Sequence, residues 1–138
     1  MKTVKDTQYL ISETTREIES LKRSVVEANK VVLRTNEEAD KVRKRVKSFR
    51  NEIKKKLDRI KFLRDVILYL ESEPREAYLK NQESLLQDRI SKVDEKIETL
   101  RSVSRAPIAL ANQIKAVKAE FNYDKHKKQL DVIQFILN

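Results

Sequence analysis

The chain contains no glycine, no cysteine and no tryptophan, and it has only two prolines, Pro74 and Pro107, in 138 residues. Without cysteine there can be no disulfide, no thiol nucleophile and no cysteine-ligated zinc. Without glycine, a phosphate-binding glycine-rich loop cannot form in its usual way. Because glycine and proline are the residues that most often interrupt helices, their scarcity predicts a few long helices and no β-sheet.

Long hydrophobic stretches are also missing. Hydrophobic residues make up 39% of the chain and charged residues 38%, a balance that suits long, thin helical packing. No apolar run is long enough for a transmembrane helix, and the N-terminus lacks the apolar core of a signal peptide. We therefore expect a soluble, intracellular protein of the cytoplasm, nucleoid or nucleus.

What the sequence does contain is a seven-residue repeat of apolar side chains. One series recurs at every seventh residue from Val4 to Ile67, and a second series, offset by three residues, runs from Thr7 to Leu70. These spacings define positions a and d of a coiled coil. The residues expected to form the seam between chains are Ile11, Ile18, Leu21, Val25, Val32, Val42, Val46 and Phe49.

The repeat continues unbroken through residues 35–38, with the sequence TNEE, which resembles a capping box at the start of a new helix. Thr35 would accept a hydrogen bond from the backbone of Glu38 in that arrangement. We give the unbroken repeat more weight, so the prediction is one continuous helix from Val4 to Leu70.

The charges beside the seam favour a parallel homo-oligomer. Between parallel chains, positions g and e bring Glu17 near Lys22 and Glu38 near Arg43, and both pairs are attractive. A narrow seam suits two chains best, although a higher oligomer is possible. The alternative is a monomer in which the later helices fold back on the long one.

Both prolines are expected at the first turns of new helices. The long helix should end near Glu71, with Ser72 or Glu73 capping a second helix that packs back, antiparallel, along residues 45–70. A serine just before Pro107 should cap a third helix, which residues 122–124 could break before an apolar C-terminus. The predicted fold class is all-α, with residues 1–56 as a coiled-coil oligomerisation segment and residues 57–138 as an antiparallel helical bundle packed on the distal part of the long helix.

Positive charge is concentrated in the middle of the long helix. The net charge of the chain is +9. Residues 41–64 contain 12 lysines and arginines against two acidic residues, a net charge of +10, whereas residues 65–100 carry −4. On the heptad, six cations fall at positions e and b and form one continuous line, the basic stripe: Arg43, Lys47, Arg50, Lys54, Lys61 and Arg64.

The basic stripe is the predicted nucleic-acid-binding site, because a line of cations follows a phosphate backbone without reading its sequence. The competing interpretation is that acidic residues of the second helix neutralise it. Those acidic residues are Glu76, Glu83, Asp88, Asp94, Glu95 and Glu98. Residues 41–100 together still carry +6, which argues against full neutralisation. Phe62 and Tyr123 are the candidates for stacking on a base, but packing roles are the simpler interpretation.

An enzyme is not expected. The single histidine, His126, lies in a lysine-rich run that opposes a metal cation, and Asp94, Glu95 and Glu98 share one helix as ordinary surface acids. The sequence therefore predicts no cofactor, no bound metal and no small-molecule substrate.

The function predicted from these features is that of a non-enzymatic, basic coiled-coil oligomer that binds nucleic acid, an accessory factor for DNA or RNA processing or recombination. The alternative is an assembly adaptor that uses the coil as a spacer. Its apolar C-terminus would dock a protein partner through Leu130, Ile133, Phe135 and Leu137. Binding to an anionic membrane is disfavoured by the lack of tryptophan and of an apolar face beside the basic stripe.

Overall fold

The computed structural model describes residues 1–30, 35–103 and 105–138. Within these ranges the chain forms helices and no strand, so the prediction of an all-α fold is confirmed. The helices are α1 (Val4–Asn29), α2 (Asn36–Leu70), α3 (Glu76–Val103), α4 (Pro107–Glu120) and α5 (Tyr123–Leu137). They divide into two units: Thr3–Glu71 holds α1 and α2, and Ser72–Asn138, together with Met1 and Lys2, holds α3, α4 and α5.

The prediction of a single helix from Val4 to Leu70 is wrong. Helix α1 ends at Asn29, and α2 begins at Asn36 with Thr35 as its N-cap. The Thr35 hydroxyl accepts a hydrogen bond from the backbone N–H of Glu38 at 3.1 Å, and Glu37 and Glu38 place negative charge in the first turn, where the helix dipole favours it. The heptad pattern did not reveal the start of α2 because the apolar residues keep the same seven-residue spacing in both helices of the hairpin.

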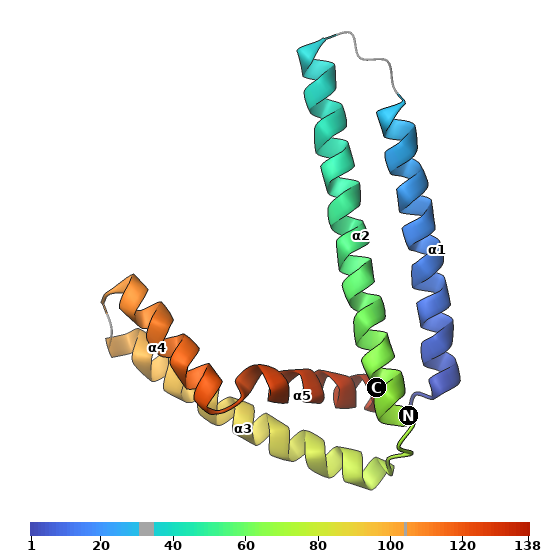
Figure 1. Cartoon of the computed structure of the whole chain (residues 1–138). Coiled ribbons are helices and arrows are strands. Elements are labelled where there is room, and N and C mark those ends of the chain that lie inside the picture. Colours follow the sequence, from blue (N-terminus) through green and yellow to red (C-terminus); the bar gives the residue numbers. More distant parts are fainter. Residues whose placement is uncertain (31–34, 104) are drawn as a thin grey trace. The chain divides into compact units, whose positions relative to one another are not determined.

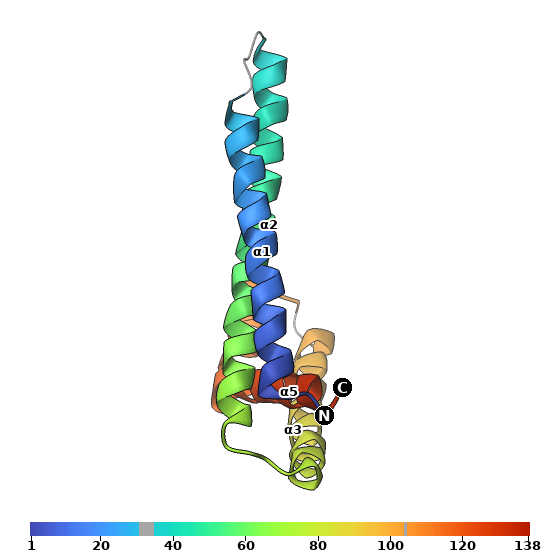
Figure 2. The same cartoon turned by 90° about the vertical axis from the view of Figure 1, so that its right-hand side faces the viewer.

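Helices α1 and α2 lie side by side in opposite directions (Figures 1 and 2). The register is marked by an ion pair between Glu17 and Lys56, and by Ile18, which lines the same groove as Ile60. Ile18, Val46 and Ile60 are all buried. Part of the apolar seam that the sequence assigned to contacts between chains is therefore buried within one chain.

Threonine at position d is accommodated through the backbone. Thr7 is completely buried, and its hydroxyl donates a hydrogen bond to the carbonyl oxygen of Thr3 at 2.9 Å. Thr14 makes the same kind of bond to Leu10 at 2.8 Å. Because each hydroxyl has a partner in the preceding turn, a polar residue in the seam does not leave an unsatisfied buried group.

The end of the hairpin is where the sequence placed it. Helix α2 ends at Leu70, and Glu71 caps it. The two units divide directly after Glu71. The predicted functional division at residues 56 and 57, which lies within the long helix, stays a prediction. Leu57 and Leu68 remain 52% and 67% exposed, so the apolar surface at this end of α2 is only partly covered.

In the second unit, α4 and α5 run back along α3 (Figure 1). Helix α3 and helix α5 supply the buried side chains of this unit, and α4 supplies none. The buried residues are Leu79, Leu86, Ile90, Val93 and Ile97 on α3, and Leu130, Val132, Ile133 and Ile136 on α5. The expected packing of α3 along residues 45–70 involves both units and stays a prediction.

One of the two prolines begins a helix, and the other lies two residues before one. Pro107 is the first residue of α4, as predicted, although the N-cap is Ala106, which makes no side-chain capping bond. Ser104, one of the serines expected to cap it, lies outside the described residues. Pro74 precedes the first turn of α3: the helix begins at Glu76, and the Arg75 carbonyl accepts from the N–H of Leu79 at 3.0 Å. Ser72 and Glu73 therefore lie too far upstream to cap it.

Within the described ranges, two residues adopt left-handed backbone conformations, and neither is a glycine. Asn122 has φ 51° and separates α4 from α5, which confirms the predicted break at residues 122–124. Glu73 also has φ 51°, in the connection between α2 and α3. Asparagine tolerates this region better than most residues, whereas glutamate bears the full steric cost of its Cβ.

The antiparallel register generates a first prediction. Glu17→Lys and Lys56→Glu should each lower the free energy of unfolding, and the double variant should recover about 0.5 to 1 kcal/mol of the combined loss. Denaturant titration of the four proteins measures this coupling. In a parallel coil of continuous helices, residues 17 and 56 would lie about 58 Å apart, so a measurable coupling would exclude that arrangement.

The strained backbone at Glu73 generates a second prediction. Glu73→Gly should raise the free energy of unfolding by about 1 kcal/mol, because glycine adopts positive φ without a steric penalty. The matched control is Ser91→Gly at an exposed position inside α3, which should lower it by about 0.5 kcal/mol. Thermal or denaturant unfolding distinguishes the two, and a loss of stability in both variants would show that Glu73 is not strained.

Candidate nucleic-acid interface

All six residues of the basic stripe lie on α2, and all six side chains are exposed. They follow the side of the helix next to its buried residues, since each stripe residue comes directly after a position of the seam. Leu57 interrupts the line between Lys54 and Lys61. The structure therefore brings the predicted cations together on one side of the hairpin, in the order expected.

The neighbouring side of α1 offers almost no negative charge to this stripe. Two shallow grooves between the helices show which residues meet. One groove, of about 490 Å³, places Asn29 beside Arg43, Lys47 and Arg50. The other, of about 380 Å³, places a short α1 segment beside Lys61 and Arg64. The α1 residues of that second groove are Thr15, Ile18, Glu19 and Lys22.

Glu19, the one acid that α1 contributes to these grooves, already has a partner. Its carboxylate lies 3.8 Å from the ammonium group of Lys22 on the same helix. The parallel arrangement predicted from the sequence would have paired α1 acids at position g with cations at position e. In the hairpin, Glu17 at position g instead pairs with Lys56, which lies in the seam and outside the stripe.

Most stripe cations have no ion-pair partner among the described residues. Arg43 is the exception, with its guanidinium 3.5 Å from the carboxylate of Asp40 one turn earlier. Lys47, Arg50, Lys54, Lys61 and Arg64 form no ion pair within the ranges that the structure covers. These five exposed cations, which form no ion pair among the described residues, give one side of the helix a high positive potential.

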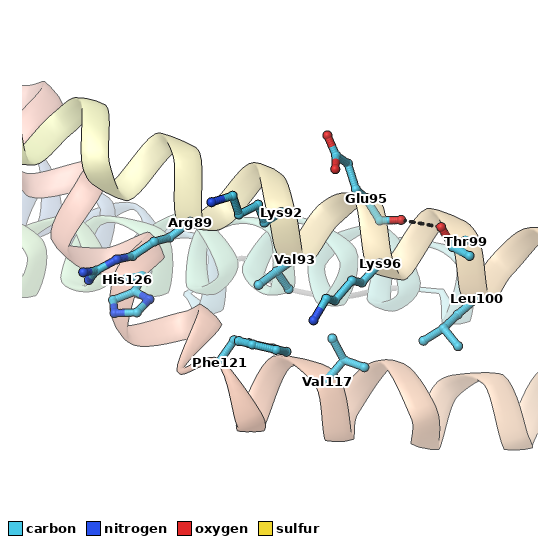
Figure 3. A pocket seen from close by; sticks show the side chains of 10 residues that line it. All are labelled: Arg89, Lys92, Val93, Glu95, Lys96, Thr99, Leu100, Val117, Phe121 and His126. Carbon is cyan, nitrogen blue, oxygen red and sulfur yellow. Dashed lines mark hydrogen bonds between the residues drawn. The ribbon is translucent and has the colours of Figure 1, made fainter.

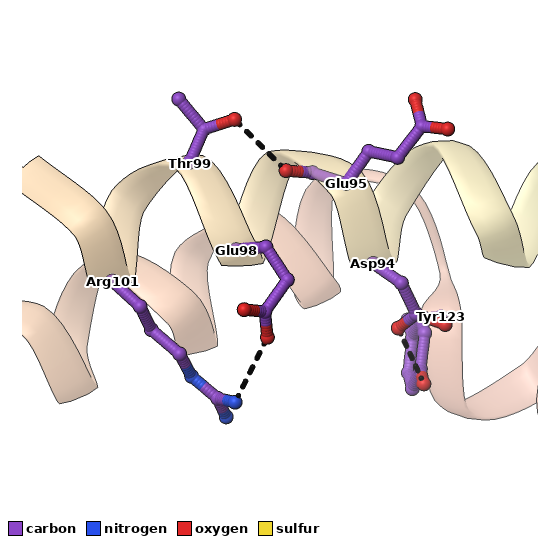
Figure 4. A network of polar contacts seen from close by, with 6 residues as sticks. All are labelled: Asp94, Glu95, Glu98, Thr99, Arg101 and Tyr123. Atoms are coloured by element: carbon purple, nitrogen blue, oxygen red, sulfur yellow. Dashed lines mark hydrogen bonds and ion pairs between the residues drawn. The ribbon is translucent and has the colours of Figure 1, made fainter.

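Four of the six α3 acids that were expected to neutralise the stripe have side-chain partners in their own unit, and Figure 4 shows two of them. Glu98 pairs with Arg101 at 3.2 Å, and Asp94 accepts a hydrogen bond from the Tyr123 hydroxyl at 3.0 Å. Glu95 extends away from both, with its carboxylate on the opposite side of the helix (Figure 4). Glu76 and Asp88 pair with Lys80 and Lys92 on α3 itself, at 3.4 and 3.1 Å.

The aromatic residues weighed for base stacking have intramolecular contacts. Phe62 is half-buried, with the Arg59 guanidinium 5.3 Å from its ring centre. The Tyr123 ring lies 5.1 Å from the Lys118 ammonium group. Burial raises the pKa of the Tyr123 hydroxyl above its ordinary value, and the hydrogen bond to Asp94 raises it further. Both rings contact side chains of their own chain. Nucleic acid would therefore be bound mainly through contacts between the stripe cations and phosphate groups.

The predicted seam residues differ in burial. Ile18 and Val46 are buried, and the others that the structure describes are half-buried: Ile11, Leu21, Val25, Val42 and Phe49. Val32 lies outside the described residues.

The residues predicted to dock a protein partner are largely engaged within the chain. Leu130 and Ile133 are buried, and Phe135 and Leu137 are half-buried. The ammonium group of Lys2 lies 4.4 Å from the Phe135 ring centre and donates a hydrogen bond to the Phe135 carbonyl oxygen at 3.0 Å. The C-terminus thus packs within its own unit. This is the alternative to docking on a partner protein that its apolar composition also allowed.

His126 is half-buried and lines a groove between α3 and α4, a location that the sequence did not reveal. No group of three or more metal-binding side chains occurs among the residues that the structure describes. Within the same residues, no helix combines the length and apolar character needed to cross a membrane.

Comparisons with known proteins add no functional information. No protein-family model matches the chain, and no curated protein or solved structure is significantly similar to it.

The like charges of the stripe generate a third prediction. Replacing Lys47, Arg50 and Lys54 together by glutamine should leave the helical spectrum intact and raise the free energy of unfolding by a few tenths to about 1 kcal/mol at low salt, because repulsion between successive turns is removed. The gain should vanish near 1 M salt, where charges are screened within about 3 Å. A loss of stability at low salt would mean that these cations have stabilising partners.

Proposed function

We propose that the chain is a non-enzymatic protein that binds nucleic acid through the basic stripe of α2. The observation that carries the proposal is the set of five exposed stripe cations without ion-pair partners, beside an α1 side whose one acid is already paired. Such cations replace the counterions condensed on a phosphate backbone, and the release of those counterions drives binding. Contacts of this kind fix position and carry no base sequence.

The geometry of the stripe supports a linear polyanion as the ligand. From Arg43 to Arg64 the stripe follows α2 for about 32 Å, and the grooves beside it place the amide side chain of Asn29 next to the cations. Amide groups donate hydrogen bonds to phosphate oxygens, as lysine and arginine do. An accessory role in nucleic-acid processing or recombination is the corresponding biological proposal.

The proposal replaces the predicted parallel homo-oligomer by a monomer. The seam was expected to hold two parallel chains, yet Ile18 and Val46 are buried in a chain whose α1 and α2 contact each other. This observation favours the alternative of a monomer as the nucleic-acid-binding species. The adaptor function is less well supported, because two of its four docking residues are buried.

The salt dependence of binding tests the proposal and is our fourth prediction. Fluorescence anisotropy with labelled single- and double-stranded oligonucleotides should show an affinity that falls linearly with salt on logarithmic axes. Charge reversal at three stripe positions, Lys47→Glu, Arg50→Glu and Lys54→Glu, should abolish binding at 0.15 M salt. Neutralisation of the same three residues by glutamine should lower the slope for duplex DNA by about 2.7.

The matched control reverses three cations on α1 that lie outside the stripe: Lys5, Arg16 and Arg23. All three are exposed, and their reversal changes the net charge of the chain by the same amount. This control should retain most of the binding. Equal losses in the two triple variants would reduce the effect to net charge alone, and unchanged binding in the stripe variant would exclude the stripe as the interface.

A further inference from the structure

A groove of about 790 Å³ lies between α3 and α4, and His126 from the start of α5 also lines it (Figure 3). Its apolar lining comes from Val93 and Leu100 on α3 and from Val117 and Phe121 on the opposite side. The volume is within the range of small-molecule sites, which are mostly apolar with a few convergent polar groups.

The groove has different chemistry at its two ends. Arg89 and His126 lie together at one end, and Leu100 lies at the other (Figure 3). Arg89 and Leu100 are about 16 Å apart along the α3 axis. Lys96 lies between them, with its ammonium group 4.0 Å from the centre of the Phe121 ring. The groove therefore runs from a cationic end to an apolar end.

The cations of the groove are available to an anion. Neither Arg89 nor Lys96 has an ion-pair partner among the described residues, whereas Lys92 is paired with Asp88 at 3.1 Å. Glu95, the one acid of the lining, directs its carboxylate away from the groove (Figure 3). An arginine and a lysine facing an apolar trough without a carboxylate leave a positive charge that a ligand can neutralise.

The groove exists because α4 does not close onto α3. No residue of α4 is buried, although Leu110, Ile114 and Val117 are apolar and half-buried on its inner side. Ile108 at the start of α4 is 81% exposed. A ligand with an apolar body would bury surface that the helices themselves leave accessible to water, and this burial would stabilise the complex.

We propose that this groove binds a single-chain amphiphile with an anionic head group, such as a long-chain carboxylate. The head lies against Arg89 and His126, and the nearby ammonium group of Lys96 adds to the positive potential that attracts it. The alkyl tail extends over Phe121 and Val117 toward Leu100. The direction of the ligand follows from the separation of charge and apolar surface along the groove. This site is independent of the basic stripe on α2.

The test uses the full chain and dodecanoate below its micellar concentration, with binding measured by calorimetry and by NMR of methyl groups in the groove. We expect saturable binding with one site, and shifts confined to Val93, Leu100 and Val117. Neutral dodecanol should bind at least tenfold more weakly, since it lacks the charge. Equal affinity for dodecanol, or shifts spread over both units, would overturn the proposal.

Variants separate the site from general charge effects. Arg89→Gln combined with Lys96→Gln should weaken dodecanoate binding at least tenfold, whereas Lys115→Gln combined with Lys125→Gln, which removes two exposed cations outside the groove, should leave it unchanged. Similar losses in both pairs would contradict the site. Charge reversal at Lys47, Arg50 and Lys54 should leave dodecanoate binding intact, so failure of the nucleic-acid proposal and failure of this one are distinguishable.

Two further measurements identify the source of the head group. Lysophosphatidate should compete with dodecanoate if the groove accepts any anionic head, and inorganic phosphate alone should not compete, because it has no tail. Competition by phosphate alone would overturn the amphiphile proposal in favour of a simple anion site. Dimerisation of the chain that blocks dodecanoate would overturn it in favour of a second copy as the occupant.

Discussion

The antiparallel contact between α1 and α2 determines which charges of the first unit meet. A heptad repeat specifies an apolar face but not the direction of the helix that covers it. In a parallel pair the acids of the N-terminal segment would lie across from cations, and part of the positive charge would be compensated. In the hairpin, Glu17 reaches Lys56 in the seam. The polar residues of α1 that line the grooves beside the stripe are Thr15, Glu19, Lys22 and Asn29. The stripe stays largely uncompensated because α1 runs antiparallel to α2.

Much of the fold was predictable because local chemistry determined it. Proline at residue 107 begins a helix since its fixed φ suits the first turn, and the end of α2 follows from the residues before Pro74. The break at Thr35 was visible as a capping sequence but was outweighed by the repeat. The two signals were in fact compatible, since a cap acts within one turn, whereas the repeat reports only the face on which apolar side chains lie.

The candidate site was predictable in its residues and not in its surroundings. Helical spacing alone placed the six stripe cations on one side of α2, because positions e and b are neighbours on any helix. Which acids would reach them depended on tertiary contacts, and sequence offered no measure of that. Three acids of α3 pair with a lysine or arginine three or four residues away, as Glu98 does with Arg101. The groove at Arg89 and His126 was missed because it depends on how closely α4 packs on α3, which the pattern of neither helix reveals.

Helix α4 differs from its neighbours in how it is held. It contributes no buried residue, whereas α3 and α5 contribute nine between them. A helix with few buried apolar contacts opens locally at a lower free energy than the core it adjoins. The backbone amides of residues 108–120 will therefore exchange their hydrogens with solvent through local opening that leaves α3 and α5 folded. The second unit thus combines a firmly packed pair of helices with a third that opens on its own.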